Sequence, residues 1–568
     1  MKNTKANRRS FLFSIILFFT TNFLTAQIPS WQWAKGSGGV NNEEGLNTCV
    51  DANGNVYVVG YFQSPNISFG SYTLINYDAP GYSIYIVKYN TLGNVLWAKS
   101  ASGYAASKAA TAIDVDSNGN LYITGYYGGY TITFGSITLT NVSGYSDFFI
   151  AKYDNMGNVL WANGFGGHSY EYSQSIKVDI NNDILVTGTF YSPSIVFGND
   201  SIVNPNIGCF GDIFIAKFSS AGNYIWAKQA GGYGADQGNA ITTDPNGNIY
   251  LTGYTRSSTP CMFDTISLTP STGSGYKENF IAKYSSSGEA IWAKNFGTSL
   301  QDEGKSICTD INGNVYITGS FYYYNSNGYM MNLDNNNSII NRGGKDSYLI
   351  KYDSLGNILW SKGVGGINYD EGNSVRCDVS GNIYLAGYSR SPYLFIDNDS
   401  LLINNGLFIM KYNDQGNKQW IVPVTAGGFC ATATANSMCL NNNNDIYITG
   451  SFTNPSIKFG NDSLSAFASD CTNDIFIAKL ALLSTNVQKE VLPPMFNIYP
   501  NPSRDFIFIN NIKGKSTITL YDVFGKLFIK KESDTDLILD VHNLPKGLYT
   551  IVSESNKENT YTKIIICD

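Results

Sequence analysis

The stretch Asp116-Ser117-Asn118-Gly119-Asn120-Leu121-Tyr122-Ile123-Thr124-Gly125 combines a tight polar turn with a run of aliphatic and aromatic residues. The same unit continues with Phe149-Ile150-Ala151-Lys152-Tyr153 and then with Gly157-Asn158-Val159-Leu160-Trp161-Ala162. It is repeated seven times, about every 65 residues, a period typical of a solenoid, a propeller or another repeat array. Its clearest markers are seven tryptophans and seven glycines: Trp33, Trp97, Trp161, Trp226, Trp292, Trp360 and Trp420, and Gly60, Gly125, Gly188, Gly253, Gly319, Gly387 and Gly450.

Within each unit the residues alternate with a period of two, which predicts β-strands. The runs 55–62 (NVYVVGYF) and 120–127 (NLYITGYY) are rich in β-branched and aromatic residues and are bounded by Gly and Asn. A D-x-N-G-N turn joins each run to the strand before it, because Asn-Gly readily adopts the positive φ angles of a tight hairpin. A second hairpin follows, as in residues 213–228 (IFIAKFSSAGNYIWAK). Each unit is therefore predicted to contain four antiparallel strands.

The two ends of the repeat region predict how the array closes. Residues 31–35 are typical of a fourth strand without the first three, and residues 475–479 of a third strand without a fourth. We expect the N-terminal strand to complete the last unit and close an all-β, seven-bladed β-propeller over residues 27–480, which removes exposed sheet edges. An open β-solenoid is the alternative. Each unit is longer than a WD-type blade, which has roughly 40 to 45 residues. The additional residues lie between the second and third strands, where a recurring Phe-Gly predicts an extra hairpin on one face.

The joint recurrence of the turn, the glycine and the tryptophan resembles the bacterial SBBP β-propeller repeat over about residues 31–480. This resemblance implies the propeller fold and export from the cell. It implies no activity, because proteins with this repeat share none.

The N-terminal region predicts export. Residues 1–26 have the form of a signal peptide, in which Lys2, Lys5, Arg8 and Arg9 precede an apolar run; a membrane anchor is the alternative. No other stretch is suited to cross a bilayer as a helix, so we expect no transmembrane segment in the mature chain. The formal net charge of −7 becomes −11 without the four leader cations, which argues against nucleic acid as a partner.

The composition changes after residue 480. Residues 481–494 predict a linker, and residues 495–568 contain short alternating strands typical of a small Ig-like β-sandwich. This segment resembles the type A C-terminal sorting domain of the type IX secretion system of Bacteroidetes, through Tyr499, Pro500, Asn501, Pro502, Gly525, Lys526, Gly547 and Tyr549. The resemblance implies that the domain engages the secretion machinery, directs passage across the outer membrane and is then removed, leaving the protein released or surface-attached. A generic adhesive sandwich is the alternative.

Nine cysteines are an odd number for an exported chain. Three of them occupy one repeated position on the first strand, where small buried side chains are expected: Cys49, Cys308 and Cys439. Four lie in connections and form two candidate disulfides, Cys209 with Cys261 and Cys430 with Cys471. No C-x-x-C pair exists, so neither a zinc site nor haem attachment is predicted.

Acidic residues are the main chemical signal. Connections between blades carry acids at equivalent repeat positions: Glu43, Glu44, Glu171, Asp236, Asp302, Glu303, Asp370 and Glu371. If first strands line a central channel, these acids surround one mouth of it, where they bind cations or a basic or hydroxylated ligand, or supply the paired carboxylates of a glycosidase. The alternative is that each acid caps backbone amides of its own loop. The D-x-N-G-N turns resemble calcium loops only weakly, because they lack the later Glu, and no cofactor is expected.

Catalytic motifs are otherwise lacking in the sequence. Its two histidines are His168 and His542, and it contains neither H-E-x-x-H nor G-x-S-x-G. We therefore expect a non-enzymatic binding or adhesion module for a carbohydrate or protein ligand, exported to the surface or the medium. A carbohydrate-active enzyme using the channel-mouth carboxylates and a structural surface-layer component are the alternatives.

Overall fold

The computed structural model describes most of the chain between residues 28 and 566. The residues outside the description are 1–27, 104–106, 142, 206–209, 271–274, 299, 324–329, 335–336, 398, 428–431, 454, 469–470, 482–496, 501–502, 511, 513–514, 523–525, 556–558 and 567–568. The predicted signal peptide and all but the first residue of the predicted linker therefore lie outside the described residues. Internal contacts divide the chain into two compact units, Met1–Leu482 and Leu483–Asp568.

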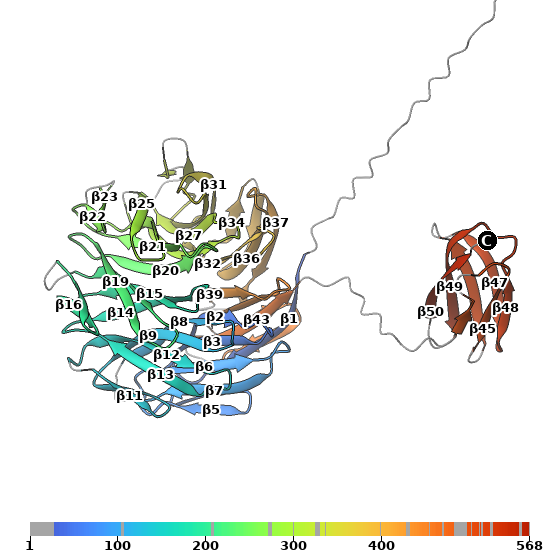
Figure 1. The fold of residues 1–568 in the computed structure, drawn as a ribbon, viewed down its shortest axis with the longest axis horizontal. Coiled ribbons are helices and arrows are strands. Elements are labelled where there is room, and N and C mark those ends of the chain that lie inside the picture. Colours follow the sequence, from blue (N-terminus) through green and yellow to red (C-terminus); the bar gives the residue numbers. More distant parts are fainter. Residues whose placement is uncertain are drawn as a thin grey trace, which may run out of the picture. The chain divides into compact units, whose positions relative to one another are not determined.

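The first unit is a ring of antiparallel sheets, and in each blade four strands follow one another outward from the centre (Figure 1). In the first blade they are β2 (Glu43–Val50), β3 (Val56–Phe62), β6 (Ser83–Tyr89) and β7 (Val95–Ala101). The second and third blades contain β8 (Lys108–Val115), β9 (Leu121–Gly128), β12 (Ser146–Tyr153) and β13 (Val159–Phe165), then β14 (Glu171–Val178), β15 (Ile184–Phe190), β18 (Asp212–Phe218) and β19 (Tyr224–Gly231). The next three contain β20 (Gln237–Thr243), β21 (Ile249–Thr255), β24 (Glu278–Tyr284) and β25 (Ala290–Phe296); β26 (Glu303–Thr309), β27 (Val315–Tyr322), β30 (Lys345–Tyr352) and β31 (Ile358–Gly365); and β32 (Asp370–Cys377), β33 (Ile383–Ser389), β36 (Gly406–Tyr412) and β37 (Lys418–Val424).

The seventh blade joins the two ends of the repeat region. Three of its strands come from the end of the region, β39 (Ala433–Leu440), β40 (Ile446–Phe452) and β43 (Asp474–Ala481). The fourth is β1 (Ser30–Ser37), which pairs antiparallel with β43 and places Trp33 opposite Lys479. The predicted seven-bladed propeller, closed by its N-terminal strand, is therefore confirmed.

The extra residues of each blade form a short hairpin between the second and third strands, as predicted. The hairpins are β4 (Asn66–Phe69) with β5 (Tyr72–Ile75), β10 (Thr131–Phe134) with β11 (Ile137–Thr140), β16 (Ser194–Phe197) with β17 (Asp200–Val203), β22 (Cys261–Phe263) with β23 (Ile266–Leu268), β28 (Met330–Asn332) with β29 (Ser338–Ile340), β34 (Tyr393–Ile396) with β35 (Asp399–Leu402), and β41 (Ser456–Phe459) with β42 (Asp462–Ser465).

Their position differs from the expected decoration of one face. The hairpins lie at the outer rim, where Figure 1 labels β5, β11, β16, β22 and β23. There β22 pairs with β19 and β34 pairs with β31, the outer strands of the preceding blades, and β41 pairs with the short strand β38 (Ala426–Gly427). The reason is hydrophobic burial, since Ile132 and Phe134 are fully buried in the core between two blades.

A tryptophan of the fourth strand connects a blade to the next one. The indole nitrogen of Trp97 donates a hydrogen bond to the carbonyl oxygen of Asn155 at 3.1 Å, in the second hairpin turn of the following blade. Gly157 of that turn has a φ of 82°, and a Cβ there would lie 3.0 Å from the Trp97 ring. The same arrangement recurs for Trp161 with Gly222, Trp292 with Gly356 and Trp360 with Gly416. The repeated tryptophan thus touches the glycine of the second hairpin turn across the blade boundary.

The second unit contains two small antiparallel sheets, which confirms the predicted β-sandwich. One sheet is formed by β44 (Asn497–Tyr499), β45 (Phe506–Asn510) and β48 (Leu537–Asp540), and the other by β47 (Leu527–Ser533), β46 (Ser516–Asp522), β49 (Gly547–Ser555) and β50 (Asn559–Ile566). Ile507 and Leu539 from the first sheet share a buried core with Ile518 and Ile551 from the second. Of the predicted motif, Asn501, Pro502 and Gly525 lie outside the described residues. Across the described parts of both units, no helix is long and apolar enough to cross a membrane.

Candidate functional site: the central channel

The first strands of the seven blades surround a cavity of about 780 Å³. Each of these strands has a β-bulge at the same place, for example between Gly45 and Asn47 in β2 and between Gly304 and Ser306 in β26. A bulge adds one residue to a strand and redirects its side chain. In every blade the added residue lines the cavity, and these residues are Leu46, Thr111, Gln174, Asn239, Lys305, Asn373 and Asn436.

Four of these bulge residues also bind the backbone of the next blade. The side-chain amide of Asn239 donates to the carbonyl oxygen of Gly304 at 2.7 Å. Asn436 makes the same bond to Gly45 at 3.0 Å, across the join between the two ends of the repeat region. Thr111 and Asn373 bind Ser173 and Ala435 in the same way. The polar wall of the channel is therefore held in a fixed arrangement, which favours ligand binding because less side-chain freedom is lost.

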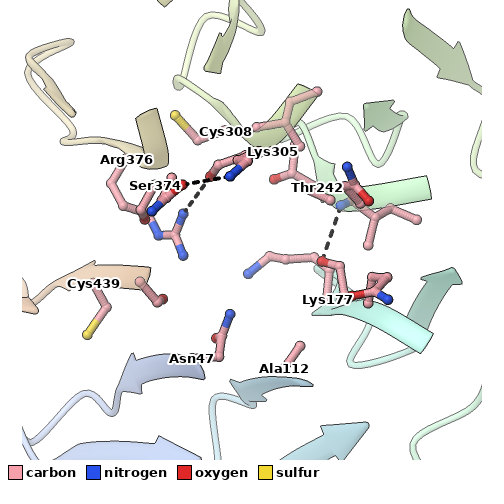
Figure 2. A pocket seen from close by; sticks show the side chains of 18 of the residues that line it. Asn47, Ala112, Lys177, Thr242, Lys305, Cys308, Ser374, Arg376 and Cys439 are labelled. Atoms are coloured by element: carbon pink, nitrogen blue, oxygen red, sulfur yellow. Dashed lines mark hydrogen bonds between the residues drawn. The ribbon is translucent and has the colours of Figure 1, made fainter. Parts of the chain in front are cut away.

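A second ring of side chains lines the cavity three residues further along each first strand. It consists of Cys49, Asp114, Lys177, Thr242, Cys308, Arg376 and Cys439. Figure 2 shows Lys177 and Arg376 extending from different blades toward the open centre, with Asn47 nearby. The three cysteines of this ring are buried, as predicted from their shared repeat position.

The acids that we expected at the channel mouth fall into two groups, and the first group is buried in the loops. It consists of Glu43, Glu171, Asp236, Asp302 and Asp370, each at most 1% exposed. Asp302, for example, accepts hydrogen bonds from the backbone nitrogen of Tyr322 at 3.1 Å and from the hydroxyl of Thr298 at 2.9 Å. Burial raises the pKa of Asp302 to about 7 and that of Glu171 to about 7. These five acids hold loop amides in place and do not form an open ring.

The second group consists of Glu44, Glu303 and Glu371. Of these, Glu303 and Glu371 line the cavity. Glu371 binds Lys305 and Lys345, and although burial opposes its ionisation, the charges of the two lysines lower the pKa of Glu371 to about 2. Glu303 lies 3.5 Å from the ammonium group of Lys277. Glu44 instead accepts a hydrogen bond from the side-chain amide of Asn473 at 3.3 Å. Of the expected ring of acids, only Glu303 and Glu371 therefore reach the cavity, and each is paired with lysine.

Three acids and three cations line the cavity, and they differ in how they are paired. Asp114, Glu303 and Glu371 are its lining acids, and Lys177, Lys305 and Arg376 are its lining cations. Lys277 and Lys345 pair with Glu303 and Glu371 from outside the lining. Lys177 pairs with Asp114 at 2.7 Å. Arg376, by contrast, donates its hydrogen bonds in the described structure to neutral oxygens, the hydroxyl of Ser306 at 3.4 Å and the carbonyl of Val375 at 2.8 Å. Lys177 and Arg376 could not be singled out from the sequence, because each occurs once at a position that varies among the repeats.

The aspartate of each D-x-N-G-N turn is used by the turn itself. One oxygen of Asp116 accepts the backbone N–H groups of Asn118 and Asn120, and the other accepts the Asn120 amide and the Tyr122 hydroxyl. This geometry confirms the predicted hairpin turn. In the described residues, no group of three or more His, Cys, Asp or Glu side chains is arranged to hold a metal ion.

The cysteines depart in part from the predicted pairing. Cys261 is a buried free thiol 3.9 Å from a carboxylate oxygen of Asp236, so the predicted bond to Cys209, which lies outside the described residues, is not formed. Cys471 is disulfide-bonded, and Cys430, its expected partner, lies outside the described residues. Cys377, which no repeat position singles out, lies 3.2 Å from Cys308.

The four-stranded blades, the closing strand β1 and the polar central channel define a β-propeller protein. The SBBP family, described as a beta-propeller repeat, matches residues 225–258 and 291–320, and the Por secretion tail family, described as a secretion system C-terminal sorting domain, matches residues 497–567. The chain is thus an SBBP-repeat β-propeller protein with a type IX secretion sorting domain. The resemblances drawn from the sequence are confirmed, and the sorting domain indicates export to the medium or the outer-membrane surface.

Two curated proteins share part of the sequence. An uncharacterized WD repeat-containing protein L264 of Acanthamoeba polyphaga mimivirus is 25% identical over 537 residues, covering 79% of this chain and 38% of that protein. The regulatory protein FlaEY of Caulobacter vibrioides is 22% identical over 277 residues, covering 47% and 28%. The chain therefore spans less than half the length of these relatives. Among solved structures, a PL25 ulvan lyase has 12% identity and a TM-score of 0.38, covering 73% of this chain and 93% of that one.

Proposed function

We propose that this protein is an exported binding module whose central channel receives an anionic, hydroxylated ligand such as an acidic carbohydrate. The observation that carries the proposal is the position of Arg376, which lines the cavity with Lys177 and binds only neutral oxygens in the described structure (Figure 2). A guanidinium group presents a planar fork of donors that matches a carboxylate or a sulfate. The amide and hydroxyl groups of the bulge residues supply hydrogen bonds for ligand hydroxyls.

The size of the cavity favours a small or slender ligand over a protein surface. Its volume of about 780 Å³ falls within the range of roughly 300 to 1,000 Å³ that is common for small-molecule sites. A protein partner would instead require a broad exposed surface, because stable protein interfaces bury about 800 Å² on each side. A carbohydrate ligand is therefore preferred over a protein partner.

Binding is preferred over glycoside hydrolysis because of the state of the acids. A glycosidase needs one carboxyl group that can donate a proton near the working pH, next to the substrate. Glu371 lines the cavity, but the two neighbouring lysines hold its pKa at about 2. Asp302 has a raised pKa, but it is fully buried against its own loop. This distribution supports a channel that binds without cleaving.

The proposal can be tested with an array of acidic and neutral oligosaccharides, probed in parallel with calcium and with a chelator. We expect the exported chain to select acidic glycans and the variant Arg376→Gln to lose that selection. The variant Lys362→Gln is a matched control. Lys362 pairs with Asp397 at a distance of 2.9 Å and does not line the channel. Failure of the folded protein to bind any glycan would contradict the carbohydrate proposal and would favour a structural role at the surface.

A further inference from the structure

Two cysteines from neighbouring blades lie side by side in the channel wall. Cys308 belongs to β26 and Cys377 to β32, and their sulfur atoms are 3.2 Å apart. The Cys377 sulfur also lies 2.9 Å from the carbonyl oxygen of Thr309. In the sheets described, β26 pairs with β27 and β32 pairs with β33. The two sulfurs therefore meet at a boundary between separate sheets, where packing of side chains connects the blades.

We propose that Cys308 and Cys377 form a disulfide in the exported protein and join the fifth and sixth blades covalently at the channel wall. A disulfide has an S–S distance of about 2.05 Å, so the two sulfurs need to approach by only about 1.2 Å. The compartments that an exported chain passes through favour disulfides. The propeller already contains one disulfide-bonded cysteine, Cys471.

The bond forms by thiol–disulfide exchange with an oxidised disulfide of a protein or small-molecule oxidant. The thiolate of one cysteine attacks the oxidant and releases one of its sulfurs as a thiolate. The second cysteine then attacks the mixed disulfide and releases the other sulfur. Overall, the two cysteines lose two protons and two electrons, and the disulfide of the oxidant gains the electrons.

The surroundings of the pair in the folded ring indicate when this reaction takes place. Hydrogen bonding to Cys308 and burial raise the pKa of the Cys377 thiol well above its usual range, so little reactive thiolate exists in the folded ring. Oxidation therefore precedes or accompanies the docking of the two blades. The bond closes a loop between positions 69 residues apart in the chain, which restricts the unfolded state.

The other free cysteines provide internal controls. Cys261 lies near Asp236 in the fourth blade, and Cys439 lies 3.7 Å from the hydroxyl of Thr48. Both are free thiols. They experience the same oxidant during export. If Cys308 and Cys377 are oxidised while Cys261 and Cys439 stay reduced, the cause is therefore the geometry of the pair and not the redox conditions alone.

The test is peptide mapping of the full chain recovered from the medium or the cell surface. The protein is denatured in an alkylating reagent without reduction, digested and analysed by mass spectrometry. We expect a cross-linked peptide that contains Cys308 and Cys377 and is lighter by two hydrogen atoms than the two thiol peptides, while Cys261 is alkylated. Reduction after denaturation should release the two peptides as separate thiols.

Two outcomes would overturn the proposal. One is complete alkylation of both Cys308 and Cys377 in the unreduced sample; the other is a cross-link from either residue to a different cysteine. As a second measurement, the double variant Cys308→Ser/Cys377→Ser should unfold at a Tm a few degrees lower than the oxidised protein. After full reduction, which also breaks the bond at Cys471, the two proteins should unfold at the same Tm, and equal Tm values before reduction would also count against the bond.

Discussion

The indole nitrogen of Trp33 donates a hydrogen bond to the carbonyl oxygen of Thr91 at 3.0 Å. Trp33 lies in β1, the outer strand of the seventh blade, and Thr91 lies in the turn after β6 of the first blade. Trp97 makes the equivalent bond to Asn155 between the first and second blades. The join between the two ends of the repeat region is thus built like the other blade boundaries.

We expect Trp33→Ala to lower the free energy of unfolding by about 3 to 5 kcal/mol, because it removes a large side chain from a packed blade boundary. Trp97→Ala is the matched control, since both tryptophans are 8% exposed and make the same bond. Urea denaturation of the two variants measures the losses. A nearly neutral Trp33→Ala beside a destabilising Trp97→Ala would contradict closure of the ring by β1.

The glycine in the second hairpin turn is predicted to be required for two reasons. Gly157 has a φ of 82°, and a Cβ there would lie 3.0 Å from the Trp97 ring. Gly198, in the turn between β16 and β17, is the control residue. It has a φ of 62°, but no atom would lie within 4 Å of a Cβ added there. Both Ala variants should lose about 1 to 2 kcal/mol through the left-handed backbone, and Gly157→Ala should lose clearly more. Equal losses, measured by thermal unfolding, would show that the tryptophan contact does not constrain the turn.

The buried acids predict a loss of stability as the pH rises from about 4 to 7. Burial raises the pKa of Asp302 from 3.8 to about 7, so between these values the folded state binds more protons than the unfolded state. The free energy of unfolding therefore falls across this range. Asp302→Asn removes one of these groups and should reduce the difference in Tm between pH 4.5 and about pH 7.5. An unchanged difference would mean that Asp302 does not take up a proton on folding.

The turn aspartates predict that calcium has no stabilising effect on the propeller. The two carboxylate oxygens of Asp116 already accept hydrogen bonds from the backbone and side chain of Asn120, from the backbone of Asn118 and from Tyr122. Calcium would have to displace these donors. We expect the same Tm in calcium and in chelator. A calcium-dependent rise of several degrees, absent from Asp116→Asn, would overturn this prediction.

The fold could be predicted from the sequence because its determinants are local and repeated. Trp97 and Gly157 recur together since they contact each other across a blade boundary. The D-x-N-G-N turn, represented by Asp116, contains its own hydrogen-bond partners within a few residues. The position of the inserted hairpins at the rim could not be read in this way, because it depends on the apolar groove between two blades.

The site was harder to predict because it depends on the direction of each side chain. The repeat period places Asp302 and Glu303 next to each other, but it does not say which one faces the channel. The bulge between Gly304 and Ser306 shifts the register, and a shift of one residue turns a side chain to the other face. As a result, Asp302 is buried in its loop, whereas Glu303 and Lys305 line the cavity.

The most direct test of the channel proposal is isothermal titration of the exported chain with a tetragalacturonate and with a neutral tetragalactose. A charge-assisted hydrogen bond to Arg376 should strengthen binding of the acidic sugar about tenfold or more. Arg376→Gln should abolish this preference without changing the Tm, and added salt should weaken binding of the acidic sugar only. Equal affinities for the two sugars, or an acidic preference that survives Arg376→Gln, would contradict the account.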